Sequence, residues 1–296
     1  MSTAAAPLLS PELLAQLTRL ELVSRKIFRG RLKGERRSPR KGQSVEFADF
    51  RNYVPGDDLR FLDWNLYARL DKLFLKMFLE EEDLHFYTLV DDSRSMGFGD
   101  PTKLRFAQQL AAALGYIGLV RSDRVRIDRM GQPLRELAPV LRGRGSLWRM
   151  QEYLEGFQPE GTASLAEGVK NFCLRNTGKG ILVLISDLMD KSGYEAAMRM
   201  LVSRQMDVYL IHVLSPEELD PDVTGDLRLV DCEDDDVAEI TVSAPLLKRY
   251  KQTLGAFVDG ARDFCTRRGM GYILARSDMA VGELVTSYLR RRGLVR

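Results

Sequence analysis

The stretch Phe86-Tyr-Thr-Leu-Val-Asp-Asp-Ser-Arg-Ser-Met-Gly97 joins an apolar, β-rich run to a series of polar side chains. Phe86 to Val90 has the composition of a buried strand. The residues that follow place three short oxygen-bearing side chains at alternate positions, namely Asp91, Ser93 and Ser95. In a loop that leaves a strand, side chains with this spacing can converge on one point. The stretch therefore predicts a strand that delivers a polar site at its carboxyl end.

Similar apolar runs recur along the chain and alternate with segments of helical periodicity. The further strands are expected at residues 124–127, 180–185, 206–213 and 270–274, with helices at 102–120, 165–175, 245–267 and 280–292. This alternation predicts an α/β fold with a mostly parallel, doubly wound, Rossmann-like sheet. Residues 133–137 follow the 124–127 run too closely for a parallel crossover, so we expect them to form one antiparallel edge strand.

Two later segments add oxygen ligands to the first stretch. Thr162 precedes the helix predicted at 165–175, and Asp187 ends the strongly apolar run that begins at Ile181. Ligands of doubly wound sheets gather beyond the carboxyl ends of the strands, where the strand order reverses. With the strand order 3-2-1-4-5-6, Asp91 and Asp187 end neighbouring strands at that point. The alternative is structural, because Ser and Asp at such junctions are ordinary helix caps.

The first 83 residues differ in character from residues 84–296, which we expect to form the main domain, with a small hairpin insertion near 226–242. A basic stretch runs from Arg25 to Lys41 and contains a single acidic residue, Glu35. It is followed by a turn at Pro55-Gly56 and by Asp57 and Asp58, either of which can cap a short helix. The cluster from Arg51 to Trp64 is either a packed turn or a docking surface.

Composition limits the classes of protein to which the chain can belong. It has 296 residues, of which 45% are hydrophobic and 29% charged, and a formal net charge of +2. These values are typical of a globular protein with no global preference for nucleic acid or membranes. Three scattered cysteines and two histidines cannot assemble the usual zinc sites. Without a membrane-length apolar segment or an export signal, we expect a cytoplasmic protein.

The polar residues resemble a known site. Asp91, Ser93 and Ser95, followed by Thr162 and Asp187, are similar to the metal-ion-dependent adhesion site of von Willebrand factor A domains. Residues 44–64, 214–219, 225–231 and 289–295 resemble the bacterial domain-of-unknown-function family 58, so that the likeness extends from about residue 10 to the end. The resemblance implies a von Willebrand factor A-like fold for residues 84–296, preceded by a family-specific segment. It also implies a protein that acts beside MoxR-type AAA+ ATPases in chaperone or complex-maturation systems.

The resemblance does not imply catalysis. The chain would be a metal-dependent protein–protein interaction module, in which a partner's Asp or Glu completes the shell of a Mg²⁺ or Mn²⁺ ion. It also implies that Ser93, Ser95 and Thr162 ligate the ion directly, whereas Asp91 and Asp187 hold its waters. The expected partner is a MoxR-type AAA+ ATPase, a client protein, or both.

Two other functions remain open. A metal-dependent phosphohydrolase could use the acid after the first strand as a nucleophile, although Ser93 stands where such sites carry a second Asp. A nucleic-acid-binding protein could use residues 25–41, although Phe28 is the one aromatic residue among these cations. We expect His212 to be a core residue, because it falls in an apolar strand, and Trp64 and Trp148 to be packing residues.

Overall fold

The computed structural model describes residues 7–24, 46–79, 84–131, 133–160, 164–204, 206–230 and 237–296. The chain divides into two compact units, one formed by Met1–Leu32 with Leu84–Arg296 and the other by Lys33–Asp83. The basic stretch at 25–41, Thr162 and the acidic run at 231–236 lie outside the described residues. The two units are described separately below.

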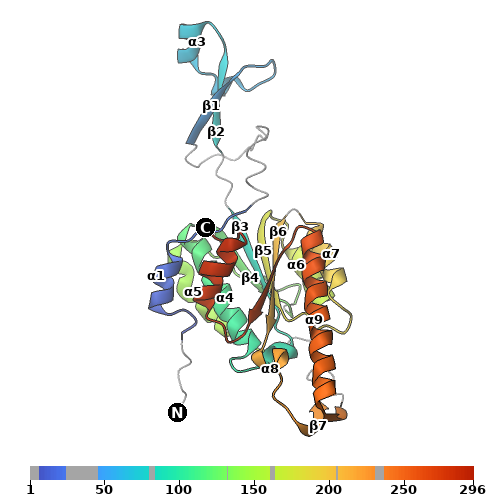
Figure 1. The fold of residues 1–296 in the computed structure, drawn as a ribbon. Helices are drawn as coiled ribbons and strands as arrows, with labels where there is room; N and C mark the ends of the chain where they lie inside the picture. The colour runs from blue at the N-terminus through green and yellow to red at the C-terminus, as the bar shows by residue number, and fades with distance from the viewer. Residues whose placement is uncertain are drawn as a thin grey trace. The chain divides into compact units, whose positions relative to one another are not determined.

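The larger unit is built on a five-stranded sheet whose strands are all parallel (Figure 1). Its strands are β3 (His85–Val90), β4 (Arg124–Arg129), β5 (Gly180–Ser186), β6 (Met206–Leu214) and β9 (Gly271–Arg276), in the order β4-β3-β5-β6-β9. The order reverses between β3 and β5, which is the switch point of a doubly wound sheet. Their register aligns Val90 with Ile185, so that Asp91 and Ser186 follow at the same level. The predicted Rossmann-like α/β architecture is confirmed.

The predicted antiparallel edge strand at residues 133–137 is wrong. Beside β4 the structure has a single antiparallel bridge, in which Val125 and Leu141 exchange two backbone hydrogen bonds of 2.9 and 2.8 Å. Pro133 begins the segment and Pro139 follows it, and neither has an N–H group to donate to a ladder. The edge of the sheet is therefore covered by irregular chain rather than by a sixth strand.

Helices cover both faces of the sheet, and alternate side chains of each strand supply the two cores. One core packs Phe86 and Ile185 under α4 (Lys103–Val120) and α5 (Leu147–Glu155). The opposite core packs Leu89 and Leu184 under α6 (Leu165–Arg175), α7 (Glu195–Val202) and α9 (Ala244–Arg267). Every residue of β5 and β6 is buried, as expected for central parallel strands. The core therefore holds the strand ends of the switch point rigidly.

The first helix belongs to the larger unit, although the sequence analysis groups it with residues 1–83. Helix α1 (Pro11–Leu17) begins at the N-cap Ser10, whose side chain accepts a hydrogen bond of 3.2 Å from the backbone N–H of Leu13. Leu17 has no exposed surface and lies in the same core as α4. Leu22 forms an antiparallel bridge with Val295, which joins the two ends of the unit.

The smaller unit pairs β1 (Glu46–Asn52) with β2 (Phe74–Leu79) in an antiparallel ribbon. Between them lie the short helix η1 (Leu59–Phe61), capped by Asp58 as predicted, and α3 (Trp64–Leu70), capped by Asp63. Gly56 takes the positive φ of 103° that the Pro55-Gly56 turn predicts.

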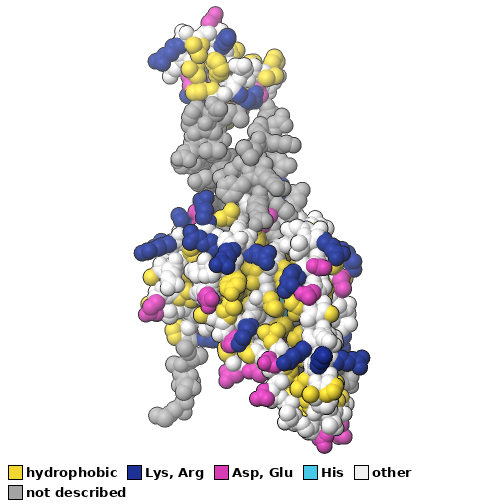
Figure 2. All heavy atoms as spheres, viewed as in Figure 1, with side chains coloured by type: hydrophobic (Ala, Val, Ile, Leu, Met, Phe, Trp, Pro, Cys, Tyr) yellow, Lys and Arg dark blue, Asp and Glu magenta, His cyan; other side chains and the backbone are white. Residues whose placement is uncertain are grey.

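Trp64 is not the packing residue that we predicted, because 63% of its surface is exposed. The exposed hydrophobic side chains of the smaller unit also include Leu59, Phe61, Tyr67 and Leu70. In Figure 2 hydrophobic side chains of this unit lie at its surface among Lys and Arg. Trp148, in the larger unit, is 66% exposed, so its predicted packing role is also wrong.

The remaining elements lie between the sheet strands or after the last of them. They are η2 (Arg94–Gly97), η3 (Arg144–Ser146), α8 (Pro216–Leu219), the hairpin of β7 (Gly225–Val230) and β8 (Val237–Val242), α10 (Val281–Glu283) and the π-helical turn η4 (Leu284–Leu289). In the parts of the chain that the structure describes, no helix combines the length and apolar character needed to cross a membrane.

Candidate functional site

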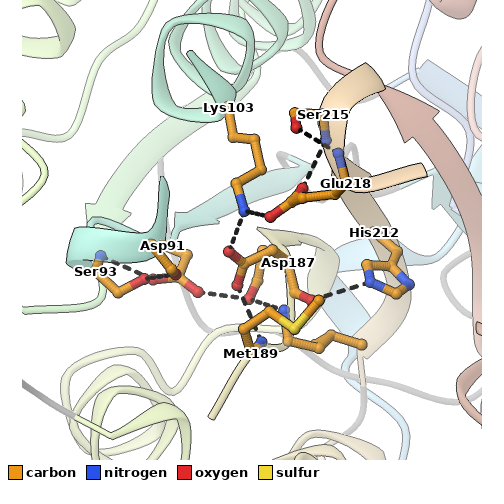
Figure 3. Close-up of polar contacts among 11 residues, drawn as sticks. Asp91, Ser93, Lys103, Asp187, Met189, His212, Ser215 and Glu218 are labelled. Carbon is orange, nitrogen blue, oxygen red and sulfur yellow. Dashed lines mark hydrogen bonds and ion pairs between the residues drawn. The ribbon is translucent and has the colours of Figure 1, made fainter. Parts of the chain in front are cut away.

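Polar side chains meet where β3 and β5 end at the switch point of the sheet (Figure 3). Asp91 and Asp187 follow these two strands and are buried, with 5% and 1% of their surface exposed. Ser93 and Ser95, on the loop and the η2 turn after β3, are half-buried. Their hydroxyl oxygens lie 3.0 Å apart. The arrangement therefore presents two accessible hydroxyls beside two buried carboxylates.

Asp91 is held in place by hydrogen bonds to both carboxylate oxygens. Its Oδ1 accepts a bond of 3.0 Å from the backbone N–H of Ser93, and its Oδ2 accepts a bond of 2.5 Å from the Ser186 hydroxyl. Burial, with repulsion from the nearby Asp187 carboxylate, raises the pKa of Asp91 to about 6. A cation between the two carboxylates would relieve that repulsion.

Asp187 begins a sharp turn after β5. The next residue, Leu188, has a φ of 60°, which is rare for a residue with a branched side chain and is typical of functional loops. The turn brings the backbone N–H of Met189 to 3.0 Å from Asp187 Oδ1, and the backbone N–H of Leu188 to 2.9 Å from the Ser186 hydroxyl. The backbone therefore fixes the orientation of the carboxylate.

Lys103 is the site residue that the sequence analysis missed. It is the first residue of α4, and its Nζ lies 2.7 Å from Asp187 Oδ2 and 2.5 Å from Glu218 Oε1. Burial by itself would lower the pKa of Lys103, but the two carboxylates outweigh burial and raise it. A positive charge is therefore present beside Asp187 in the absence of any metal.

Two titratable residues near the site are engaged in other contacts. His212 Nε2 lies 3.0 Å from the Asp187 carbonyl oxygen, and its Nδ1 lies 2.9 Å from the Tyr272 hydroxyl. Burial lowers the pKa of His212 to about 4, so the ring is neutral and is not free to act as a base. Asp92 accepts a hydrogen bond of 2.6 Å from the backbone N–H of Gly131, beyond the end of β4. Of the two adjacent aspartates, Asp91 is therefore the one that contacts the residues at the end of β5.

The start of α6 lies beside the loop that follows Asp187. Asp190 Oδ2 accepts a hydrogen bond of 2.5 Å from the backbone N–H of Leu165, and Ser164 caps the helix. Thr162, which we predict as a ligand, is outside the described residues. The contact nevertheless ties the residues that follow Thr162 to the loop that carries Asp187.

The described oxygens suit a small hard cation. Mg²⁺ prefers octahedral oxygen ligands at about 2.0–2.1 Å, so two ligands at right angles lie about 2.9 Å apart. The two serine hydroxyls have nearly this separation, and here they form a hydrogen bond. Within the described ranges, no three His, Cys, Asp or Glu side chains gather as a metal-binding group. A metal at this position would therefore depend on the hydroxyl groups.

Comparison with protein families gives one match that covers most of the chain. The model described as "Protein of unknown function DUF58" matches residues 49–256. Curated relatives include the uncharacterized protein Mb1516 of Mycobacterium bovis and the uncharacterized protein Rv1480 of Mycobacterium tuberculosis. Each is 28% identical over 269 residues, which span 88% of this chain and 83% of the relative.

Two solved bacterial structures also align with the chain at low similarity. The conserved hypothetical protein BatB from Bacteroides thetaiotaomicron has 14% identity and a TM-score of 0.44, over 70% of this chain and 98% of its own. An aerotolerance-related membrane protein from Bacteroides fragilis has 17% identity and a TM-score of 0.41, over 70% of this chain and 97% of its own.

Proposed function

The chain belongs to the DUF58 family, whose model covers residues 49–256, and we propose that it is a non-enzymatic, metal-dependent protein-binding module. One observation carries the proposal: the half-buried hydroxyls of Ser93 and Ser95 lie next to the buried Asp91 at the switch point where Asp187 also ends a strand. Mg²⁺ or Mn²⁺ is the cofactor that this oxygen set would hold.

The site's residues divide into two roles in this proposal. Ser93, Ser95 and Thr162 would bind the cation directly, and Asp91 and Asp187 would hold its water molecules. The two aspartates are buried, whereas Ser93 and Ser95 are only half-buried, and this difference supports the division. Bound there, the metal would attract a carboxylate from outside, because neutral hydroxyl ligands leave most of its charge uncompensated.

A partner that supplies an Asp or Glu would complete the site. We propose a MoxR-type AAA+ ATPase or its client, on the family resemblance of the sequence. The exposed hydrophobic side chains of the smaller unit, with Trp64 among them, offer a second contact that does not involve metal. The charge of the metal would fix the position of the partner's carboxylate, and the apolar contact would add affinity.

The phosphohydrolase alternative receives less support from the contacts of Asp91. Both of its oxygens accept hydrogen bonds, from the Ser93 backbone and from Ser186, and these weaken a carboxylate as a nucleophile. His212, which could assist as a base, uses both ring nitrogens in other contacts. These arrangements favour binding over phosphoryl transfer.

A capture experiment tests the proposal. The purified, immobilised chain should retain a MoxR-type ATPase from native lysate in Mg²⁺, and should lose most of that retention in EDTA or with Asp91→Ala. Retention that is indifferent to the chelator and to the substitution would remove the metal from the mechanism. Hydrolysis of a phosphoester that is abolished by Asp91→Ala would instead favour the enzyme.

A further inference from the structure

Lys103 occupies an unusual position for a lysine, because its side chain has no exposed surface. It begins α4, directly after the N-cap Thr102, and its side chain points toward the loop after β5 rather than toward solvent (Figure 3). Buried lysines are rare unless they are paired. Here the ammonium group is paired twice, with Asp187 and with Glu218.

Glu218 is itself held rigidly. It is the third residue of the short helix α8, and its Oε2 accepts a hydrogen bond of 2.7 Å from the backbone N–H of Ser215. The Ser215 side chain in turn accepts a bond of 3.2 Å from the Glu218 N–H, which completes a capping box. Lys103 is therefore fixed by two elements, the loop after β5 and α8, and does not depend on Asp187 alone.

The fixed ammonium group changes the charge that a divalent cation would meet. Asp91, Asp187 and Glu218 contribute three negative charges, and Lys103 compensates one of them. Like charges repel most strongly where water is excluded, and both Lys103 and Asp187 are buried. A cation that bound near Asp187 would therefore be opposed by an ammonium group that cannot turn away into solvent.

We propose that Lys103 is a built-in counter-ion that keeps the affinity of the isolated chain for a divalent cation low. This inference rests on the proposed metal site and deepens it, because it assigns the regulation of that site to a residue outside the ligand set. Glu218 has the opposite effect on the affinity for the cation, because its negative charge neutralises part of the positive charge of Lys103. A carboxylate from a partner would replace the negative charge that Lys103 neutralises. The metal and the partner would therefore be retained together.

Titration calorimetry of the full chain with MgCl₂ and with MnCl₂ tests this inference. Lys103→Met removes the positive charge and keeps an unbranched side chain that is one atom shorter, and should bind either cation at least about tenfold more tightly than the wild type. Glu218→Gln should bind several-fold more weakly. Lys251→Met is the matched control, because Lys251 pairs with Asp220 just after α8 at an exposed position, and should leave the affinity unchanged.

A double variant protects the test against misfolding, because Lys103→Met leaves Glu218 without its cation. In the Glu218→Gln background, Lys103→Met should tighten the binding of the cation by a factor similar to that in the wild type. Thermal unfolding adds a second measurement: Lys103→Met should melt lower than the wild type in EDTA and regain stability in Mg²⁺, which replaces the lost charge.

The outcomes separate this inference from the proposed function. If the wild type binds Mg²⁺ and Lys103→Met binds it equally or more weakly, Lys103 is not an opposing charge, and the proposed metal site stands without it. If Lys103→Met binds the cation and the wild type does not, the role of Lys103 as a counter-ion is supported. The isolated wild-type chain then does not hold the metal by itself. If no variant binds either cation, both proposals are overturned.

Discussion

The Ser186 hydroxyl donates a hydrogen bond of 2.5 Å to Asp91 Oδ2, and so joins the ends of β5 and β3 at the switch point of the sheet. The two residues are 95 positions apart in the chain. Both side chains are buried, and above its pKa of about 6 the Asp91 carboxylate accepts the bond as a charged group. Hydrogen bonds to buried charged groups are worth more than those between neutral groups at the surface.

Ser186→Ala should therefore destabilise the larger unit. Loss of the donor leaves a buried carboxylate oxygen with one partner fewer, which costs about 1–3 kcal/mol in the free energy of unfolding. Urea denaturation measures the loss. Thr241→Ala is the control, because it removes a similar bond of 2.6 Å to Asp226 at an exposed position of the β7–β8 hairpin. Equal effects of the two substitutions would contradict a special role for the buried pair.

Asp187→Asn should weaken the binding of Mg²⁺ about 10–100-fold, the usual cost of removing a residue that orients a metal's ligands. The substitution preserves the shape of the side chain and the hydrogen bond from Met189, and removes the charge that would hold the metal's waters. Calorimetry gives the affinity, and circular dichroism confirms that the fold is retained. Asp278→Asn, in an exposed pair with Arg276, should change neither. Unaltered affinity in Asp187→Asn would leave this residue as a structural cap.

The site residues that follow β3 and β5 could be predicted from the sequence, but the residues that pair with them could not. Apolar runs of strand length identify where β3 and β5 stop, so Asp91 and Asp187 follow directly. Lys103 and Glu218 also belong to the site, but they lie 84 and 31 positions from Asp187 in the sequence. No local sequence pattern connects them to it. One sign was available: Lys103 shares a helix face with Ala107 and Leu110, a stripe that is otherwise apolar.

The errors have identifiable physical causes. Loop length favours an edge strand at 133–137, but Pro133 begins this segment and Pro139 follows it, and among the described residues beside β4 the antiparallel contact is the bridge at Leu141. Its residue type favours packing for Trp64, but the described part of the smaller unit is a two-stranded ribbon with two short helices, and 63% of the Trp64 surface is exposed. Burial in such a unit cannot be inferred from hydrophobicity alone.

Leu17→Ala should destabilise the larger unit by about 2–5 kcal/mol, because the truncation leaves a cavity in a fully buried position. The measurement is urea denaturation followed by the near-ultraviolet signal. Leu174→Ala, the same change at an exposed position of α6, should shift stability by no more than about 0.5 kcal/mol. If Leu17→Ala behaved like this control, α1 would not be an integral part of the core that α4 forms.

The last prediction separates two contributions to partner binding. Trp64 and Tyr67 pack edge to face in α3, with ring centroids 6.2 Å apart, and both are exposed. Trp and Tyr are enriched among the residues that contribute most to binding at protein interfaces. Trp64→Ala should therefore weaken capture of the AAA+ partner at least about tenfold, with the affinity for Mg²⁺ and the stability of the larger unit unchanged.

The same comparison with the metal removed decides whether the two contributions are independent. In EDTA, Trp64→Ala should still reduce whatever capture remains, whereas Asp91→Ala should reduce capture in Mg²⁺ alone. If the two contributions are independent, the double variant should lose the sum of the two free energies. Trp148→Ala serves as the control, since it removes an equally exposed tryptophan from the larger unit. Capture that is insensitive to Trp64→Ala would exclude α3 from the interface and leave the cation site as the proposed contact.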